Sequence, residues 1–260
     1  MLKVLKWVAI GLVVLIAGSL GLMTIANNRD VETWVFTAPA PRDAAADDGY
    51  LIFGATRNTG LDVAEILAKR GDKVTAVVRP GSDSSALKAL GVTIVSGDAL
   101  DMESVKAALA GKKYRAVLTT IACFSCNPKP DYLGNKNIFD AAKAADTKRV
   151  VLMTTIGAGD SFDAAPMTAR RFLKDMLPLK TQAEDHLKSI GLDYTIIRPG
   201  GLTFGPATGQ GLLSEDRAAF GVIGRPELAR LVVGVLDDDR TIGKTMAAFD
   251  GSLLFPFAFF

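Results

Sequence analysis

Short apolar runs alternate with helical patterns along residues 50–250. The runs are four to seven residues long, and the segments between them carry apolar residues at three- and four-residue spacing. Short runs are typical of buried strands, and the wider spacing is typical of helices that cover a sheet. The alternation therefore predicts βαβ units. Because such crossovers are right-handed, the predicted fold is an α/β Rossmann-type doubly wound parallel sheet with a ligand crevice at the carboxyl ends of its strands.

The expected elements follow one another in chain order, with no internal repeat. Strands are predicted at residues 50–54, 73–78, 92–96, 116–121, 150–155, 194–198 and 245–249. Helices are predicted at residues 59–70, 84–90, 102–109, 133–145, 170–190 and 226–236.

The beginning of the chain has a different pattern. Residues 7–26 form an apolar segment of 20 residues without a charged side chain. At about 1.5 Å per residue, a helix of this length matches the roughly 30 Å hydrocarbon core of a bilayer. The segment therefore predicts one N-terminal transmembrane helix that contacts the lipid bilayer. A cleaved signal sequence is the alternative, because Lys3 and Lys6 precede the apolar segment.

These patterns divide the chain into four parts. Residues 1–26 are the predicted membrane anchor or signal sequence, and residues 27–48 are a polar, proline-containing linker. The α/β domain is expected to occupy residues 49–251. Residues 252–260 form a hydrophobic C-terminal tail, which is too short to span a membrane and either packs on the domain or contacts a membrane or a partner.

Composition excludes several classes of function. The chain has 260 residues, and 30 basic against 28 acidic side chains leave a formal charge of +2, which gives no electrostatic basis for binding nucleic acid. A single histidine and two cysteines exclude a site with several histidines, an independent four-thiolate zinc site and a disulfide-built scaffold.

A glycine turn follows the first expected strand. The sequence Tyr-Leu-Ile-Phe-Gly-Ala-Thr-Arg-Asn-Thr-Gly spans residues 50–60 and leads into a helical segment. Gly54 permits a tight turn, and Gly60 lets the helix pack closely on the strand. The start of the helix then offers unpaired N–H groups to a pyrophosphate, so the pattern predicts a dinucleotide site.

The end of the second strand predicts which dinucleotide binds. An acidic residue at that position accepts hydrogen bonds from the ribose 2′-hydroxyl of NAD. This chain has Arg79 there instead, and Arg57 lies within the glycine turn. Two guanidinium groups suit a 2′-phosphate, so we expect NADP to bind, with NADPH preferred over NADH.

Four motifs together resemble a known family. They are the glycine turn at residues 54–60, the Gly-Asp pair at 97–98, the segment at 154–161 and the Tyr-Thr-Ile-Ile-Arg-Pro-Gly-Gly segment at 194–201. The chain is similar over about residues 50–250 to the atypical short-chain dehydrogenases/reductases, which include NmrA-like and flavin-reductase-like NAD(P)-binding proteins.

The resemblance implies an NAD(P)-binding Rossmann domain in which Asp98 and Ala99 border the adenine, Thr120 and Ile121 lie along the ribose, and Thr154, Thr155, Arg198, Pro199 and Gly200 face the nicotinamide. To these cofactor-binding residues the turn and strand pattern described above adds Gly54, Thr56, Arg57, Asn58, Thr59, Gly60 and Arg79.

The sequence departs from the larger superfamily at its catalytic motif. Reductases of that superfamily place a Tyr four residues before a Lys on the helix after strand five, and the Tyr exchanges a proton with the substrate. Here that helix carries Lys180 with Met176 four residues earlier. We therefore assign Lys180 and Thr155 as candidate catalytic residues that stabilise developing negative charge. The pair Tyr132 and Lys136 has the same spacing but occurs one crossover too early, so it is interpreted as a helix start.

The two cysteines, Cys123 and Cys126, follow the fourth strand. The favoured interpretation is two separate buried or loop thiols. A redox disulfide, half of a metal site, and a local disulfide in an oxidising compartment are the alternatives. His186 is expected to be structural or solvated.

The sequence thus favours a membrane-anchored, NADP-binding oxidoreductase that transfers a hydride from NADPH to a small quinone-, flavin- or conjugated-carbonyl-like acceptor. Flavins and quinones accept a hydride without the missing Tyr. The alternative is a non-catalytic NADPH sensor or an assembly protein with a membrane protein partner. The flanking charges do not predict the orientation of the anchor, because Lys3 and Lys6 before the apolar segment are balanced by Arg29 and Arg42 after it. Because NADPH is a cytosolic or stromal metabolite, we expect the domain to face the cytosol.

Overall fold

The computed structural model describes residues 49–253. The predicted anchor at residues 7–26, the linker at 27–48 and residues 254–260 of the tail lie outside this range. Within residues 49–253, no helix combines the length and the apolar character needed to cross a membrane.

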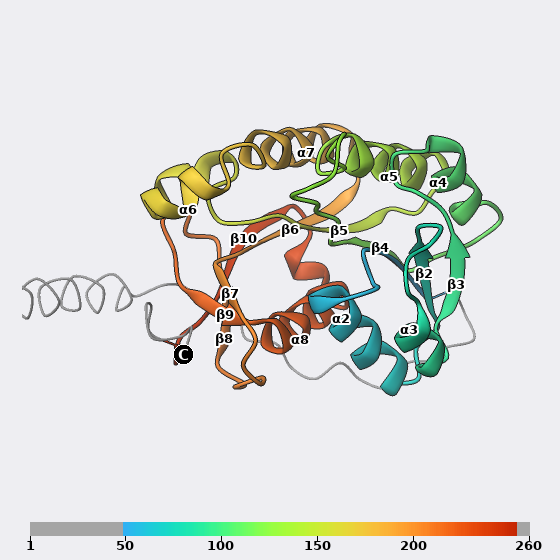
Figure 1. Cartoon of the computed structure of the whole chain (residues 1–260), viewed down its shortest axis with the longest axis horizontal. Coiled ribbons are helices and arrows are strands. Elements are labelled where there is room, and N and C mark those ends of the chain that lie inside the picture. The colour runs from blue at the N-terminus through green and yellow to red at the C-terminus, as the bar shows by residue number, and fades with distance from the viewer. Residues whose placement is uncertain (1–48, 254–260) are drawn as a thin grey trace, which may run out of the picture.

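An eight-stranded sheet forms the centre of the described domain, as Figure 1 shows. Its strands are ordered β3-β2-β1-β4-β5-β6-β10-β8, and every neighbouring pair is parallel except β10 with β8. The first six positions give the 3-2-1-4-5-6 order of a Rossmann sheet, so the predicted fold is confirmed. The strands are β1 (Tyr50–Phe53), β2 (Val74–Val78), β3 (Thr93–Ser96), β4 (Ala116–Thr119), β5 (Arg149–Met153), β6 (Asp193–Pro199), β8 (Gly211–Ser214) and β10 (Lys244–Asp250).

Helices cover both faces of the sheet (Figure 1). The helices α2 (Asn58–Lys69), α3 (Ser85–Ala89) and α8 (Arg225–Leu236) contribute to one apolar core, and α4 (Met102–Leu109), α5 (Leu133–Ala144) and α7 (Leu177–Ser189) contribute to the other. The strands β1, β2 and β4 are fully buried between these two layers, which explains why their sequences are mostly apolar, whereas the edge strand β3 is partly exposed.

The prediction of one continuous helix at residues 170–190 is wrong, because the structure has two helices in this region. The structure has α6 (Met167–Phe172) and α7 (Leu177–Ser189), with a break at residues 173–176. Pro178 causes the break, because it has no N–H to donate to a carbonyl four residues earlier and its ring collides with that carbonyl. In the first turn of α7, where N–H groups have no partner in the helix, Pro178 is tolerated.

The segment between β6 and α8 contains three short strands that were not predicted. The strands β7 (Gly201–Thr203) and β9 (Val222–Gly224) form a separate two-stranded parallel sheet, and β8 pairs with β10 at the edge of the main sheet. Strands of three or four residues are too short for their periodicity to be recognised. Two short 3₁₀ helices, Gly159–Ala164 and Asp239–Thr241, complete the described elements.

Close packing of α2 on the end of β1 positions the first helix. A Cβ atom on Gly60 would lie 2.2 Å from the carbonyl oxygen of Gly54, so a larger residue cannot occupy this position unless the backbone moves. Gly54 itself has a φ of +88°, which glycine adopts without strain. Thr120, directly after β4, donates its hydroxyl to the Gly54 carbonyl oxygen at 3.2 Å. Strand β1, helix α2 and strand β4 are thereby held together at one point.

We predict that Gly60→Ala lowers the free energy of unfolding by about 1–3 kcal/mol, because the added methyl overpacks the helix against the turn. Gly205→Ala is the control, since a Cβ there meets no atom within 4 Å. It is expected to change stability by less than about 0.5 kcal/mol. Urea denaturation of both variants measures the difference, and equal stability would contradict the packing argument.

Candidate functional site

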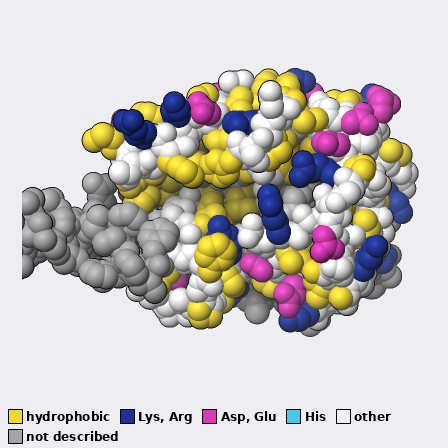
Figure 2. Space-filling view, viewed as in Figure 1, with side chains coloured by type: hydrophobic (Ala, Val, Ile, Leu, Met, Phe, Trp, Pro, Cys, Tyr) yellow, Lys and Arg dark blue, Asp and Glu magenta, His cyan; other side chains and the backbone are white. Residues whose placement is uncertain are grey.

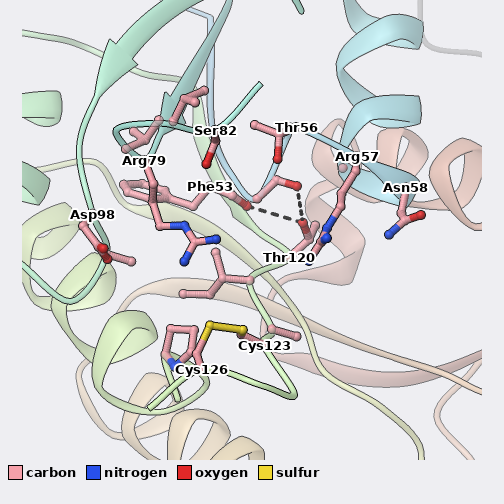
Figure 3. Close-up of a pocket in the computed structure, with 18 of the residues that line it drawn as sticks. Phe53, Thr56, Arg57, Asn58, Arg79, Ser82, Asp98, Thr120, Cys123 and Cys126 are labelled. Atoms are coloured by element: carbon pink, nitrogen blue, oxygen red, sulfur yellow. Dashed lines mark hydrogen bonds between the residues drawn. A yellow bond between two sulfur atoms is a disulfide. The ribbon is translucent and has the colours of Figure 1, made fainter. Parts of the chain in front are cut away.

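A cavity of about 900 Å³ opens at the carboxyl ends of the first strands (Figure 3). Its wall begins with the glycine turn after β1 and continues over the loops that follow β2, β3 and β4. This is the crevice position that the fold predicts. The cavity is large enough for a dinucleotide cofactor and a small ligand.

Most of the predicted cofactor-binding residues line this cavity. They are Gly54, Thr56, Arg57, Asn58, Thr59, Gly60, Arg79, Asp98, Ala99, Thr120 and Ile121. These residues lie on four different strand-to-helix connections, and the parallel sheet brings them to one edge.

The start of α2 is chemically suited to an anion. Arg57 is the N-cap residue and makes no side-chain capping hydrogen bond, and the first turn contains no acidic residue. The free N–H groups of this turn and the positive end of the helix dipole therefore meet no protein anion there. Figure 3 shows the Arg57 side chain beside Thr120, at the wall of the cavity.

Two arginines give a positive character to the part of the cavity wall that follows β1, β2 and β3. In the described part of the chain, the side chains of Arg57 and Arg79 form no ion pair. The two carboxylates of the wall are already engaged by backbone groups, because Asp98 accepts from the Leu100 N–H and Asp83 accepts from the Ser85 N–H, both at 2.9 Å. The hydrogen bond from Ser85 also lowers the pKa of Asp83. The guanidinium groups are therefore available to a ligand.

Four residues expected near the nicotinamide are placed differently. Thr154, Arg198, Pro199 and Gly200 do not line the cavity, whereas Met153 and Leu202 do. Successive side chains of a strand point to opposite faces, so Thr154 faces α7 while its neighbour Met153 faces the cavity. Gly200 marks a close backbone approach, because a Cβ there would lie 2.0 Å from the carbonyl oxygen of Gly221.

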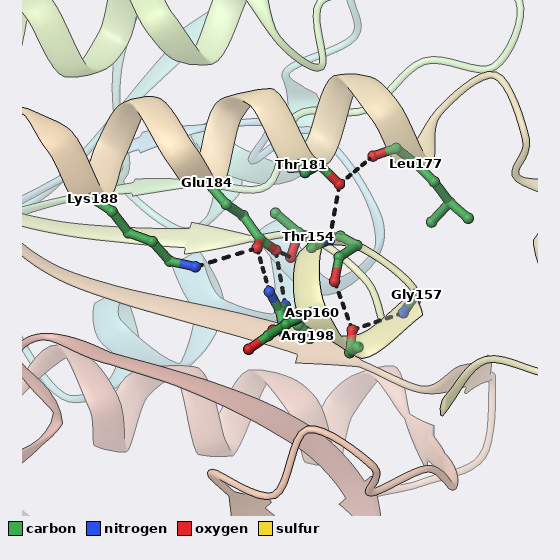
Figure 4. Close-up of polar contacts among 11 residues, drawn as sticks. Thr154, Gly157, Asp160, Leu177, Thr181, Glu184, Lys188 and Arg198 are labelled. Atoms are coloured by element: carbon green, nitrogen blue, oxygen red, sulfur yellow. Dashed lines mark hydrogen bonds and ion pairs between the residues drawn. The ribbon is translucent and has the colours of Figure 1, made fainter. Parts of the chain in front are cut away.

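A buried polar network holds Arg198 beneath α7 (Figure 4). The fully buried carboxylate of Glu184 accepts hydrogen bonds from Arg198 Nε at 3.0 Å and from the Thr154 hydroxyl at 2.6 Å. Arg198 also donates to Asp160 at 2.5 Å. Burial alone would lower the pKa of Arg198, but the bonds to Glu184 and Asp160 outweigh it and raise the pKa. The hydrogen bond from Arg198 in turn lowers the pKa of Asp160.

The candidate catalytic residues also lie outside the cavity wall. Lys180 is 7% exposed, and its Nζ forms an ion pair with Asp131 Oδ1 at 3.0 Å. Asp131 is fully buried and accepts at Oδ2 from the backbone N–H of Cys123 at 3.3 Å. Thr155 does not line the cavity either. In this structure Lys180 supports the loop after β4.

The cysteines are joined, which corrects the expectation of two separate thiols. Cys123 and Cys126 form a disulfide with their Cα atoms 5.4 Å apart, a normal separation for such a bond. Both residues line the cavity, opposite Asp98 and Arg79 in the view of Figure 3. Their spacing alone did not favour the bond, because the same spacing serves thiols, metal ligands and disulfides.

The Tyr132–Lys136 motif and His186 have structural roles in and beside helices α5 and α7. Tyr132 directly precedes the first residue of α5, as expected of a helix start, and Lys136 pairs with Asp140 at 2.5 Å. His186 contacts the same Asp140 at 2.7 Å. The described residues contain no group of three or more histidine, cysteine, aspartate or glutamate side chains that could hold a metal ion.

Arg225, at the start of α8, lines the cavity although it was not among the predicted site residues. It lies far along the chain from the glycine turn, and a Gly-Arg-Pro sequence signals a helix start without showing what the arginine faces.

We predict that Glu184→Gln lowers the free energy of unfolding by about 3 kcal/mol or more, because it leaves Arg198 buried without its main counter-charge. The control is Glu103→Gln, which breaks an exposed pair with Lys106 and should cost less than about 1 kcal/mol. Chemical denaturation at pH 7 compares the two variants. A loss at Glu184 no larger than the loss at Glu103 would show that the network does not stabilise the fold.

Comparisons with known proteins agree with the geometry. An uncharacterised chloroplast protein of Arabidopsis thaliana is 31% identical over 211 residues, which cover 75% of this chain and 74% of that protein. An uncharacterised sugar epimerase of Bacillus subtilis (strain 168) is 26% identical over 208 residues, which cover 77% of this chain and 93% of that protein.

Solved structures show the same relationship. ChuY of Escherichia coli O157:H7, described as an anaerobilin reductase, superposes with a TM-score of 0.72 at 27% identity, over 79% of this chain and 98% of that chain. The fold is therefore that of an NAD(P)-binding oxidoreductase and is related to reductases. A family model described as NAD(P)H-binding matches residues 54–239. The chain belongs to this NAD(P)H-binding family, within the atypical short-chain dehydrogenases/reductases.

Proposed function

We propose that this protein is a membrane-anchored reductase that uses NADPH to reduce a small quinone-, flavin- or conjugated-carbonyl-like acceptor. The observation that carries the proposal is the cavity at the carboxyl ends of the strands, where the glycine turn lies together with two guanidinium groups that form no ion pair within the described residues 49–253. The similarity to ChuY, whose name describes a reductase, supports the type of reaction.

The residues of the glycine turn fit the pyrophosphate of a dinucleotide. Gly54 and Gly60 have no side chains, and the Cβ positions that they leave empty lie within 3 Å of neighbouring atoms. The start of α2 offers N–H groups without an acidic side chain in the first turn. We assign the turn and the first residues of α2 to the pyrophosphate, and the wall around Asp98 and Ala99 to the adenine.

Arg57 and Arg79 support a preference for NADPH over NADH. Strand β2 ends at Val78, and Arg79 occupies the position where NAD-specific proteins carry an acidic residue. A carboxylate there would repel a 2′-phosphate, whereas a guanidinium donates hydrogen bonds to it. We assign the 2′-phosphate to these two arginines.

NADPH supplies a hydride, and one proton from solvent completes the two-electron reduction, so that NADPH, acceptor and H⁺ give NADP⁺ and reduced acceptor. The chain contributes position rather than a proton. No tyrosine lines the cavity within residues 49–253, and Lys180 is engaged with Asp131. Met153 and Leu202 provide an apolar wall against which an acceptor can be oriented.

The membrane attachment is proposed from the sequence. Residues 7–26 suit a single transmembrane helix, and the linker at 27–48 connects it to the first described strand. Because the cofactor is an intracellular metabolite, we propose that the domain faces the cytosol. Such an anchor would keep the cavity close to acceptors dissolved in the bilayer.

The cofactor assignment predicts a specific pattern of binding. Isothermal titration of the full chain in detergent is expected to show NADPH binding at least about 10-fold more tightly than NADH, because even one guanidinium–phosphate bond contributes about 1.5–3 kcal/mol. The double variant Arg57→Gln, Arg79→Gln should lose this preference and keep the affinity for NADH. Arg217→Gln, an exposed residue outside the cavity wall, is the control. Equal affinity for the two dinucleotides in the unaltered protein would contradict the assignment.

The alternative to a reductase is a non-catalytic NADPH sensor or assembly protein, and its main support is the missing catalytic tyrosine. A measurement of turnover distinguishes the two. Oxidation of NADPH, followed at 340 nm with quinone, flavin and enone acceptors, should depend on both acceptor and protein. Tight NADPH binding without oxidation by any of these acceptors would support the sensor instead.

The anchor predicts how the protein fractionates. The full chain should remain in the membrane pellet after washing with alkaline carbonate. This treatment releases proteins that are held to a membrane by electrostatic contacts, but not proteins that span it. A matched chain that begins at residue 44 should be found in the supernatant. Release of the full chain by carbonate would contradict an uncleaved anchor.

A further inference from the structure

Arg225 is a third cavity-lining arginine that the dinucleotide assignment does not use. It is the first residue of α8 and follows β9 directly. Arg57 and Arg79 belong to connections in the first half of the sheet, after β1 and β2. Arg225 lines the cavity together with Met153 and Leu202, which come from β5 and β7. A Rossmann sheet consists of two mononucleotide-binding halves, and Arg225 belongs to the second half, whereas Arg57 and Arg79 belong to the first.

The Arg225 side chain is held in place by its neighbours. Its Nη1 donates to the carbonyl oxygen of Thr203 at 3.3 Å, and its guanidinium lies over the ring of Phe204, 4.2 Å from the centroid. The following turn of α8 is fixed by Glu227, whose buried carboxylate accepts from the backbone N–H groups of Gly209 and Gly211 at 2.9 Å and 2.7 Å. The position of the guanidinium is therefore organised before any ligand binds.

Arg225 lacks a counter-charge in direct contact. Among residues 49–253 no carboxylate forms an ion pair with it, and Asp62 on α2 acts on it only through longer-range attraction. Burial lowers the pKa of Arg225, and Asp62 partly opposes this effect. A guanidinium stays protonated at neutral pH even so. A partly buried cation without a bonded anion favours a ligand that supplies one.

Apolar side chains and an exposed aromatic ring line the same cavity as Arg225. Met153, Leu202 and Phe124 line it, and the Phe124 ring is 5.4 Å from that of Phe172. Phe124, Phe172 and Phe204 are 55%, 74% and 85% exposed, far more than packing in a core would leave them. Figure 2 shows a hollow on this face of the molecule, with hydrophobic side chains on its floor and margins. Exposed aromatic rings beside a cavity favour a flat conjugated ligand, which stacks on them.

We infer that Arg225 binds an acidic group of the acceptor, and that the acceptor is a planar conjugated molecule bearing a phosphate or carboxylate rather than a neutral one. This inference rests on the proposed function, since it places the acceptor at the apolar end of the same cavity. The two arginines of the dinucleotide site bind the cofactor, and Arg225 selects the substrate by charge.

Riboflavin and its 5′-phosphate, FMN, are matched probes, because they share one conjugated ring system and differ in the phosphate. Their binding to the full chain, saturated with NADP⁺ in detergent, is followed by flavin fluorescence. FMN is expected to bind at least about 10-fold more tightly than riboflavin, the effect of one charge-assisted contact. Arg225→Gln should remove most of this preference and leave riboflavin binding unchanged. Arg225→Lys should keep part of it, and Arg217→Gln all of it.

Calorimetry with NADPH on the same variants separates this inference from the proposed function. Arg225→Gln should bind NADPH as the unaltered protein does, which also shows that the variant is folded. Loss of NADPH affinity in Arg225→Gln, with Arg225→Lys restoring it, would assign this arginine to the cofactor and overturn the inference. Equal binding of FMN and riboflavin to the unaltered protein, or binding of neither, would overturn it as well. Absence of NADPH binding in the unaltered protein would contradict the proposed function, while a preference for FMN that depends on Arg225 would still support the acidic-group site.

Discussion

The contact between Gly60 and the carbonyl oxygen of Gly54 is the constraint on which the rest of the site depends. Because no side chain separates α2 from the turn, the helix starts directly above the end of β1. The hydroxyl of Thr120 ties the same turn to the end of β4. The carboxyl edges of neighbouring strands and the positive end of a helix are thereby brought to one wall, and the cavity forms where these elements separate.

The two halves of the sheet use their polar residues differently. In the first half, the guanidinium groups of Arg57 and Arg79 lie at the cavity wall and form no ion pair with any residue between 49 and 253. In the second half, Arg198 and Lys180 are paired with Glu184 and Asp131 and stabilise the layer beneath α7. Arg225 is the exception in the second half, since it keeps its charge available to the cavity. This division is consistent with a protein that binds its cofactor through Arg57 and Arg79 and leaves Arg225 and the apolar wall for its acceptor.

The sequence predicted the parts of this arrangement that are local. The glycine turn, the strand before it and the helix after it lie within 20 residues, and the parallel sheet follows from the alternation of apolar runs and helical periods. Positions that depend on contacts distant in the chain were not predictable. Thr154 and Arg198 were assigned to the nicotinamide because the sequence does not show which face of a strand each side chain occupies. The position of Arg225 depends on how segments far apart in the chain meet. The disulfide joins cysteines only three residues apart, but this spacing also suits free thiols and metal ligands, so the spacing alone did not predict the bond. The break before α7 is a local effect of Pro178, which is tolerated in the first turn of a helix but not in its interior.

A crystal structure of the protein grown with NADPH would test the central claim most directly. The account predicts a dinucleotide within the cavity, with its pyrophosphate on residues 54–60 and its 2′-phosphate in contact with Arg57 and Arg79. A dinucleotide bound outside this cavity, or one whose 2′-phosphate contacts neither arginine, would contradict it.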